Sequence, residues 1–169
     1  ENAHGVKKDT EQAIKWYLLA SKNGNSRAQA NLAWLYQNGI GVKKDFVKAL
    51  KYYRLAADQG YPRAQTNLGF MIENGQGVMK NEKEAVGWYK KAADQDYSIA
   101  QYNLGYNYYH GIGIQQNIQE SIKWYKKAAE QGNANAQNNL GLSYAEGRGI
   151  ERNMVAAAKW YKKSADQGN

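Results

Sequence analysis

Side chains that could do acid–base, metal or nucleophilic chemistry are few in this sequence and lie far apart. The two histidines, His4 and His110, fall in different segments, and the chain has no cysteine. No serine lies in a nucleophile-elbow pattern, and Glu82 and Glu84 occupy positions typical of the start of a helix. A metal site would need several ligands close together. We therefore expect no enzymatic activity, no metal and no cofactor.

Two arginine–asparagine pairs are better suited to binding. Arg27 precedes Asn31 by four residues, and Arg63 precedes Asn67 by the same step, so each pair shares one face of a helix. Arginine can hold a carboxylate through two parallel, charge-assisted hydrogen bonds, and asparagine can bond to a backbone amide. The pairs predict a site for an extended, acidic peptide.

Large apolar side chains recur on the same predicted face, and exposed apolar patches usually mark interaction sites. They are spaced 36 residues apart, at Trp34, Phe70, Tyr106 and Leu142. Their variable neighbours, expected to make partner-specific contacts, are Ala30, Thr66, Tyr102 and Asn138. The predicted partner-binding residues are Arg27, Asn31, Trp34, Arg63, Asn67, Phe70, Tyr102, Asn103, Tyr106, Tyr109, Asn138 and Leu142.

The step of 36 residues runs through the whole chain and predicts a stacked array of helix pairs. Its clearest markers are Leu32, Leu68, Leu104 and Leu140, and the glycines Gly41, Gly77, Gly113 and Gly149. Neighbouring units of such an array supply each other's core. We expect a partial repeat at 1–24 and full repeats at 25–60, 61–96, 97–132 and 133–168. Both ends fall inside the array, which suggests a fragment of a longer protein.

Each full repeat predicts two helices joined by a glycine turn, and hence an all-α fold. In the first full repeat, the first helix is expected from Ser26 to Asn38, with an apolar stripe that includes Ala28 and Leu32. Two glycines follow in every full repeat, where backbone with positive φ is expected. The second helix begins after an Asp or Asn whose side chain can cap it. These capping residues are Asp9, Asp45, Asn81, Asn117 and Asn153.

Trp-Tyr pairs recur on the second helices, and we interpret them as core rather than as a surface for stacking sugars or bases. They are Trp16-Tyr17, Trp88-Tyr89, Trp124-Tyr125 and Trp160-Tyr161. The lysine pairs that follow, such as Lys90-Lys91, are expected to form a solvated face. Small residues at 33, 69, 105 and 141 predict the close approach of a neighbouring helix, because glycine is otherwise unfavourable in mid-helix.

The repeated motif resembles the Sel-one-like repeat (SLR), a relative of the tetratricopeptide repeat. It stands here as Ala100, Leu104, Gly105, Tyr108, Gly111, Gly113, Ile114, Trp124, Tyr125, Lys126, Ala128, Ala129, Gln131 and Gly132. The resemblance covers the whole chain and implies a right-handed α-solenoid whose first helices line a concave groove. It also implies a scaffold or adaptor that binds another protein or a peptide, and it favours a bacterial periplasmic or secreted protein, with the cytoplasm left open.

Three alternatives stay open at this point. The asparagines Asn31, Asn67, Asn103 and Asn139 either bind a ligand or hold adjacent helices together. The net charge of +8 and a pI near 9.4 allow a rival function, the binding of nucleic acid or cell-wall glycan on the aromatic groove. A third possibility is a structural spacer between other domains. The sequence does not decide the partner or the oligomeric state.

Overall fold

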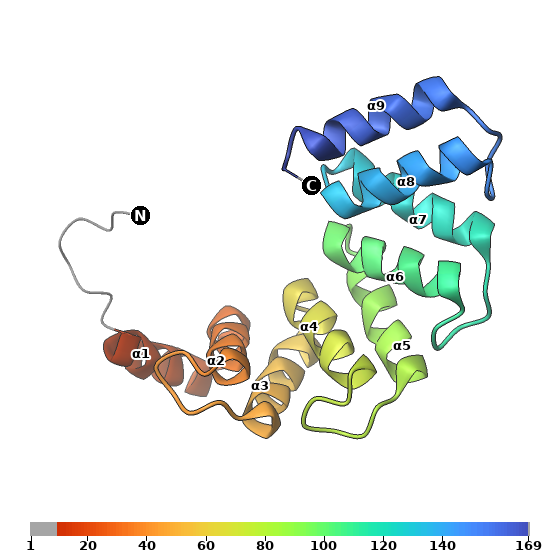
Figure 1. Ribbon diagram of the computed structural model, residues 1–169. Helices are drawn as coiled ribbons and strands as arrows, with labels where there is room; N and C mark the ends of the chain where they lie inside the picture. Colours follow the sequence, from red (N-terminus) through yellow and green to blue (C-terminus); the bar gives the residue numbers. More distant parts are fainter. Residues whose placement is uncertain (1–9, 169) are drawn as a thin grey trace. The chain divides into compact units, whose positions relative to one another are not determined.

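The computed structural model describes residues 10–168, which form α-helices joined by short loops and contain no strand (Figure 1). The all-α fold class is therefore confirmed. The predicted helix cap Asp9, His4 and the start of the partial repeat 1–24 lie outside the described residues. The chain divides into two compact units, residues 1–80 and residues 81–169.

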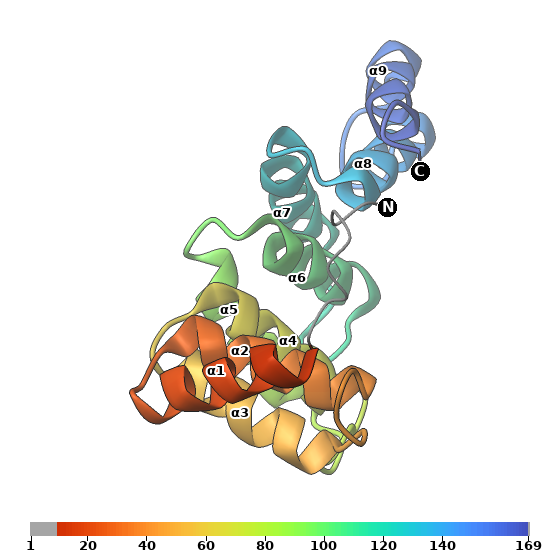
Figure 2. The same ribbon diagram turned by 90° about the vertical axis from the view of Figure 1, so that its left-hand side faces the viewer.

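The first unit contains four helices that pack in chain order. They are α1 (Thr10–Lys22), α2 (Ser26–Asn38), α3 (Phe46–Asp58) and α4 (Pro62–Glu73). Each packs on the next, and Figure 2 shows α1 and α2 side by side. Pro62 occupies the first helical position of α4, where its missing N–H group costs nothing.

The second unit contains five helices packed in the same sequential way. They are α5 (Glu82–Ala93), α6 (Ser98–His110), α7 (Ile118–Glu130), α8 (Ala134–Glu146) and α9 (Met154–Ala165). Among the helices that the structure describes, none is both long and apolar enough to cross a membrane.

Local chemistry places the helix boundaries where the sequence predicts them. The side chain of Asp45 accepts a hydrogen bond from the Lys48 backbone N–H at 2.9 Å, and Asn81, Asn117 and Asn153 cap their helices in the same way. The paired loop glycines have positive φ as expected, for example 72° at Gly111 and 65° at Gly113. A Cβ at Gly77 would lie only 2.7 Å from the backbone of Phe46, so this loop can approach α3 only with glycine.

Buried glutamines tie three helices together in each unit, a feature that the sequence analysis missed. In the second unit, Gln137 of α8 donates to the Ala129 carbonyl near the end of α7 at 3.0 Å. Its own side-chain oxygen accepts from Gln167, after α9, at 2.8 Å. The same pattern recurs at Gln101 and Gln131, and in the first unit at Gln29 and Gln59. Each buried amide therefore adds a hydrogen bond to a carbonyl at the end of the preceding helix, which also accepts from a backbone N–H of the following turn, as Ala129 does from Gly132 at 3.1 Å.

The buried surface of the first helices is broader than the sequence predicts. Ala30 and Thr66, expected to contact a partner, are 1% and 3% exposed, so this expectation is wrong. Ala30 lies on α2, which packs against both α1 and α3. Thr66 lies on α4, which packs against α3, and its hydroxyl donates to the Pro62 carbonyl of its own helix at 2.9 Å.

The Trp-Tyr pairs only partly form the core. Trp88, Tyr89 and Tyr125 are buried, but Trp16 is 61% exposed, and the other members of the pairs are half-buried: Tyr17, Trp124, Trp160 and Tyr161. Lysines three residues later cover three of the indoles, with Nζ 4.0 to 4.6 Å from the ring centroids of Trp88, Trp124 and Trp160. The lysine face is thus partly a cover for these rings.

The close helix approach predicted at residue 105 is confirmed and is made against the core tyrosine. A Cβ added to Gly105 of α6 would lie 2.8 Å from the ring of Tyr125 in α7. A Cβ added to Gly87 of α5 would meet no atom within 4 Å.

This pair of helical glycines gives a matched prediction. Gly87→Ala should raise the free energy of unfolding by about 0.5–1 kcal/mol, because alanine is the better helix former. Gly105→Ala should lower it by about 1–3 kcal/mol, because the core is overpacked. Urea denaturation of both variants measures the difference, and stabilisation by both substitutions would show that the α6–α7 contact is looser than described.

Candidate partner-binding face

The exposed side of the first helix of each repeat forms the candidate site, here called the first-helix face. In the first unit it lies on α2 and α4, and in the second unit on α6 and α8. Its apolar side chains are exposed to similar extents, with Trp34 at 41%, Phe70 at 45%, Tyr106 at 39% and Leu142 at 41%. These side chains are therefore accessible to a ligand and are not sealed between helices.

In the first unit, the polar part of this face surrounds a buried tyrosine. Asn67 donates to the Tyr53 hydroxyl at 3.1 Å, and that hydroxyl donates to Gln37 at 3.0 Å. Gln37 in turn donates to Gln76 at 3.1 Å. This bond supports the interpretation that Asn67 holds α4 to α3.

The arginines of the first unit differ in their surroundings. Arg27 is exposed on α2, and Arg63 is half-buried on α4. The positive charge of Arg63 acts on the Tyr53 hydroxyl, which places it beside the Asn67–Tyr53 bond. Asn31, four residues after Arg27, is half-buried. Each arginine–asparagine pair therefore lies at the edge of the packed surface, and Arg27 is the more exposed of the two arginines.

In the second unit, the same face is more aromatic. Tyr102 is half-buried and stacks on Tyr125 with ring centroids 6.0 Å apart. Tyr109 is half-buried, and its hydroxyl accepts a hydrogen bond from Arg148. Asn103 is half-buried and Asn138 is exposed.

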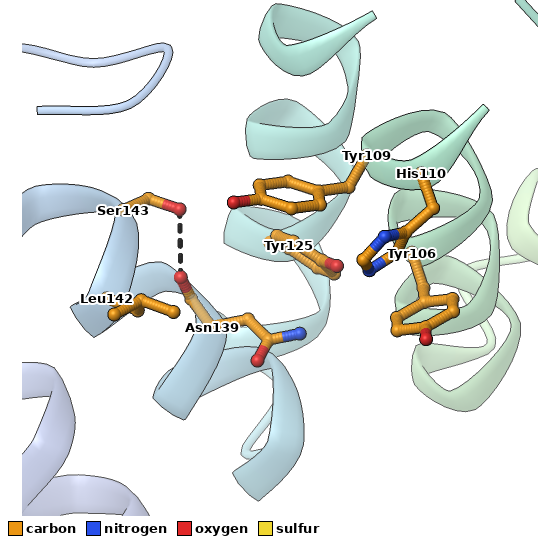
Figure 3. A pocket seen from close by; sticks show the side chains of 7 residues that line it. All are labelled: Tyr106, Tyr109, His110, Tyr125, Asn139, Leu142 and Ser143. Atoms are coloured by element: carbon orange, nitrogen blue, oxygen red, sulfur yellow. Dashed lines mark hydrogen bonds between the residues drawn. The ribbon is translucent and has the colours of Figure 1, made fainter. Parts of the chain in front are cut away.

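The structure also brings in residues that sequence reasoning did not select for this face. His110, Tyr125, Asn139 and Ser143 join Tyr106, Tyr109 and Leu142 around a pocket of about 170 Å³ (Figure 3). The sequence held one signal for this pocket, the residue type at the equivalent positions 35, 71, 107 and 143, which are Leu, Met, Asn and Ser. Serine is the smallest of these and leaves the space open.

Burial and neighbouring groups set the acidity of the core tyrosines. Burial raises the pKa of Tyr53 to about 12, while the Asn67 hydrogen bond and the Arg63 charge oppose this rise. Burial also raises the pKa of Tyr125, where hydrogen bonding by Asn139 opposes it. Asn139 thus lies beside Tyr125 much as Asn67 lies beside Tyr53.

Within residues 10–168, no three His, Cys, Asp or Glu side chains come together in a way that could hold a metal ion. The face combines aromatic rings, amides and arginines, which bind by contact, hydrogen bonding and charge.

A family model assigns the repeat. The Sel1 repeat model matches residues 1–25, 26–61, 62–97, 98–133 and 134–169, which together make up the whole chain. The chain belongs to the Sel1 repeat family. The predicted resemblance to Sel-one-like repeats is therefore confirmed, and with it the repeat-solenoid fold class. A search among curated proteins found no match.

Solved Sel1 repeat structures are closely similar. A protective antigen of uropathogenic Escherichia coli strains, which has an SLR fold, is 40% identical with a TM-score of 0.91. The match covers 97% of this chain but 35% of the antigen, so this chain spans about a third of that protein. A Sel1 repeat protein from Oxalobacter formigenes is 40% identical with a TM-score of 0.92, over 98% of this chain and 67% of that one.

A more distant structure is an immunity protein from Pseudomonas aeruginosa. It is 27% identical with a TM-score of 0.68, over 98% of this chain and 60% of that one. These similarities agree with the helix packing described above. The matched proteins differ in name and in length.

The raised pKa of Tyr53 makes stability depend on pH in a definite direction. Between pH 10 and about 12 the folded protein keeps the phenol proton that the unfolded chain loses. The free energy of unfolding should therefore fall as pH rises through this window. Tyr53→Phe should reduce that slope and, at pH 7, cost about 1–3 kcal/mol, because Asn67 and Gln37 lose their partner.

The measurement is the urea midpoint from pH 8 to 11 for the wild type, Tyr53→Phe and the control Tyr61→Phe. Tyr61 is a partly buried tyrosine of the same unit. Equal slopes for the two variants would contradict the role assigned to Tyr53.

Proposed function

We propose that the chain is a non-catalytic scaffold whose first-helix face binds an extended segment of a partner protein. The observation that supports this most directly is the exposure of a large apolar side chain at the same position of α2, α4, α6 and α8. A single exposed apolar residue is ordinary, but its repetition on the neighbouring first helices within each unit is typical of a binding surface. Aromatic residues at such positions often carry most of the binding energy.

In the first unit, the proposed segment carries acidic groups. Arg27 and Arg63 lie on the same face as Trp34 and Phe70, and within residues 10–80 neither arginine has an ion pair with a carboxylate of the chain. A carboxylate of the partner can therefore pair with a guanidinium without breaking an existing salt bridge. The charge distribution agrees, because residues 1–80 hold 12 of the 23 basic residues and 6 of the 15 acidic ones.

In the second unit, the proposed contacts are mainly aromatic and amide. The corresponding positions of α6 and α8 carry Ile99 and Asn135 in place of arginine, and Ile99 is 47% exposed. Tyr106, Leu142 and Asn138 are also exposed there. This half of the face favours apolar side chains of the partner over carboxylates.

The relatives are consistent with a protein partner. The Pseudomonas aeruginosa structure is named an immunity protein and the Escherichia coli protein a protective antigen. Neither name describes an enzyme. This chain spans only part of the length of each of these relatives. A partner for the whole protein is therefore proposed here and does not follow from their names.

Removal of the apolar contacts of the first unit should abolish partner capture. The double variant Trp34→Ala with Phe70→Ala should weaken binding at least about 30-fold, because each side chain is a candidate hot spot. The matched control is Val47→Ala with Leu55→Ala, two apolar residues of α3 that are 66% and 42% exposed. The measurement is cross-linking capture from cells of the source organism, followed by titration of the captured protein. Equal loss in both double variants would contradict the assignment of the face.

The arginines should contribute through charge. The double variant Arg27→Ala with Arg63→Ala should weaken binding of the same partner by about 1–3 kcal/mol, which is the scale of hydrogen bonds to charged groups. Lys43→Ala with Lys51→Ala removes two exposed charges outside this face and should have little effect.

Titrations at several salt concentrations also test the rival function, the binding of nucleic acid. If nucleic acid were captured and its log affinity fell steeply and linearly with log salt, the partner would be a polyanion and not a protein.

A further inference from the structure

The pocket in the second unit has a floor and a mouth built from different helices. Figure 3 shows Tyr106, Tyr109 and His110 of α6 facing Asn139, Leu142 and Ser143 of α8, with Tyr125 of α7 between them. Tyr125 and Ser143 are 1% and 3% exposed and form the floor. Tyr106, His110 and Leu142 are exposed, so the mouth opens on the first-helix face.

The pocket exists because two side chains differ from their counterparts 72 residues earlier. Ser143 corresponds to Met71, which is completely buried in the first unit. Tyr109 corresponds to Gln37, which in the first unit turns inward and accepts a hydrogen bond from the buried Tyr53. The short serine leaves empty the volume that the methionine side chain occupies, while Tyr109 contributes a wall.

The rings around the pocket are held by contacts that do not depend on a ligand. The ring of His110 lies 4.2 Å from the Tyr106 centroid and 4.9 Å from the Tyr109 centroid. Arg148 lies over the Tyr109 ring, 5.6 Å from its centroid, and donates to the Tyr109 hydroxyl. Ser143 donates to the Asn139 carbonyl within α8 at 2.8 Å (Figure 3). A pocket fixed in this way requires little ordering when a ligand binds.

Size and charge restrict what fits. A volume of about 170 Å³ is too small for a nucleotide or an extended sugar, but it is close to the 150 Å³ cavity known to hold benzene. Tyrosine and histidine rings pack well against another ring in stacked or edge-to-face geometry. No carboxylate lines the pocket. Arg148, which lies over the ring of Tyr109, pairs with Glu146 at 3.2 Å and so offers no counter-charge for a cation. A cationic ligand is therefore disfavoured, and a neutral ring is favoured.

The polar atoms of the pocket lining decide which kind of neutral ring is favoured. The Asn139 amide and the hydroxyls of Ser143 and Tyr109 come from the same lining as the apolar walls. A ring that carries one hydrogen-bonding group can therefore use both kinds of surface. This favours a phenol or an indole over a plain phenyl ring.

We propose that this pocket receives one aromatic side chain of the partner protein, a tyrosine or tryptophan ring inserted from the segment bound on the first-helix face. This rests on the proposed function, because the occupant is part of the partner. The site adds a specific requirement for the partner's sequence: an aromatic residue where the segment crosses α6 and α8.

The probe is 4-methylphenol, titrated into the whole 169-residue chain and followed by amide and side-chain NMR shifts. We expect saturable shifts confined to the pocket lining, with a dissociation constant on the order of 1 mM, as suits a ligand of so few atoms. The matched probe 4-methylcyclohexanol keeps the hydroxyl and loses the ring, and it should bind at least 10-fold more weakly. Tyramine adds a positive charge and should bind no more tightly than 4-methylphenol.

The decisive variant is Ser143→Met, which places in the pocket the residue that the chain itself uses at position 71. It should abolish the 4-methylphenol shifts and leave the thermal unfolding transition intact. Tyr106→Ala at the exposed mouth should weaken binding at least 10-fold, and it keeps the test available should Ser143→Met fail to fold. Trp34→Ala, the equivalent change in the first unit, should have no effect on this probe.

Several outcomes would overturn the proposal. They are the absence of saturable shifts, equal binding of 4-methylcyclohexanol, tighter binding of tyramine, or unchanged binding in a folded Ser143→Met variant. The test is independent of partner capture by Trp34 and Phe70. Failure of the pocket alone would leave the partner-binding face standing. If partner capture failed but the pocket bound 4-methylphenol, the proposed function would be wrong and the pocket would stand as a ring-binding site.

Discussion

The buried glutamine amides are the constraint on which the rest of the structure depends. A helix leaves its last carbonyl groups without partners, and in a stacked array these ends are covered by the next helix, where water cannot reach them. The Gln137 amide donates to the Ala129 carbonyl, which also accepts from the Gly132 N–H, and its oxygen accepts from Gln167, so that one side chain joins α8 to the ends of α7 and α9. Each first helix is thereby set at a fixed height against its neighbours. Within each unit, this holds the exposed residues on the other side of the two neighbouring first helices in register.

A scaffold held by these repeated bonds leaves other positions free to differ. Residues 71 and 143 occupy equivalent places beneath the first-helix face, but one is a buried methionine and the other a serine that leaves a pocket. The same holds for Gln37, which bonds to Tyr53 inside the first unit, and Tyr109, which forms a pocket wall in the second. Neither difference affects the glutamine bonds. Functional variation can therefore accumulate one repeat at a time without loss of the fold.

The parts of the fold that could be predicted from sequence are those decided within a few residues. The bounds Ser26–Asn38 and the cap at Asp45 follow from local hydrogen bonding, and the period of 36 residues transfers them along the chain. Side-chain burial could not be predicted in the same way. Ala30 is buried on a helix that packs against both α1 and α3, and Trp124 stays partly exposed with the Lys127 ammonium over its ring. The pocket was beyond sequence reasoning, because a cavity depends on the fit between three helices and on the size of one serine.

The exposure of the apolar series was predictable, whereas its chemistry differs between the units for a physical reason. In the first unit, Arg63 lies beside the Asn67–Tyr53 bond, and the buried Met71 occupies the position that Ser143 holds in the second unit. In the second unit the equivalent core tyrosine, Tyr125, is the floor of an open pocket. A carboxylate gains from the first arrangement and loses its hydration in the second, while an aromatic ring gains most where it can be enclosed. In the proposed binding mode, the first unit therefore selects for carboxylates of the partner and the second unit for an aromatic ring.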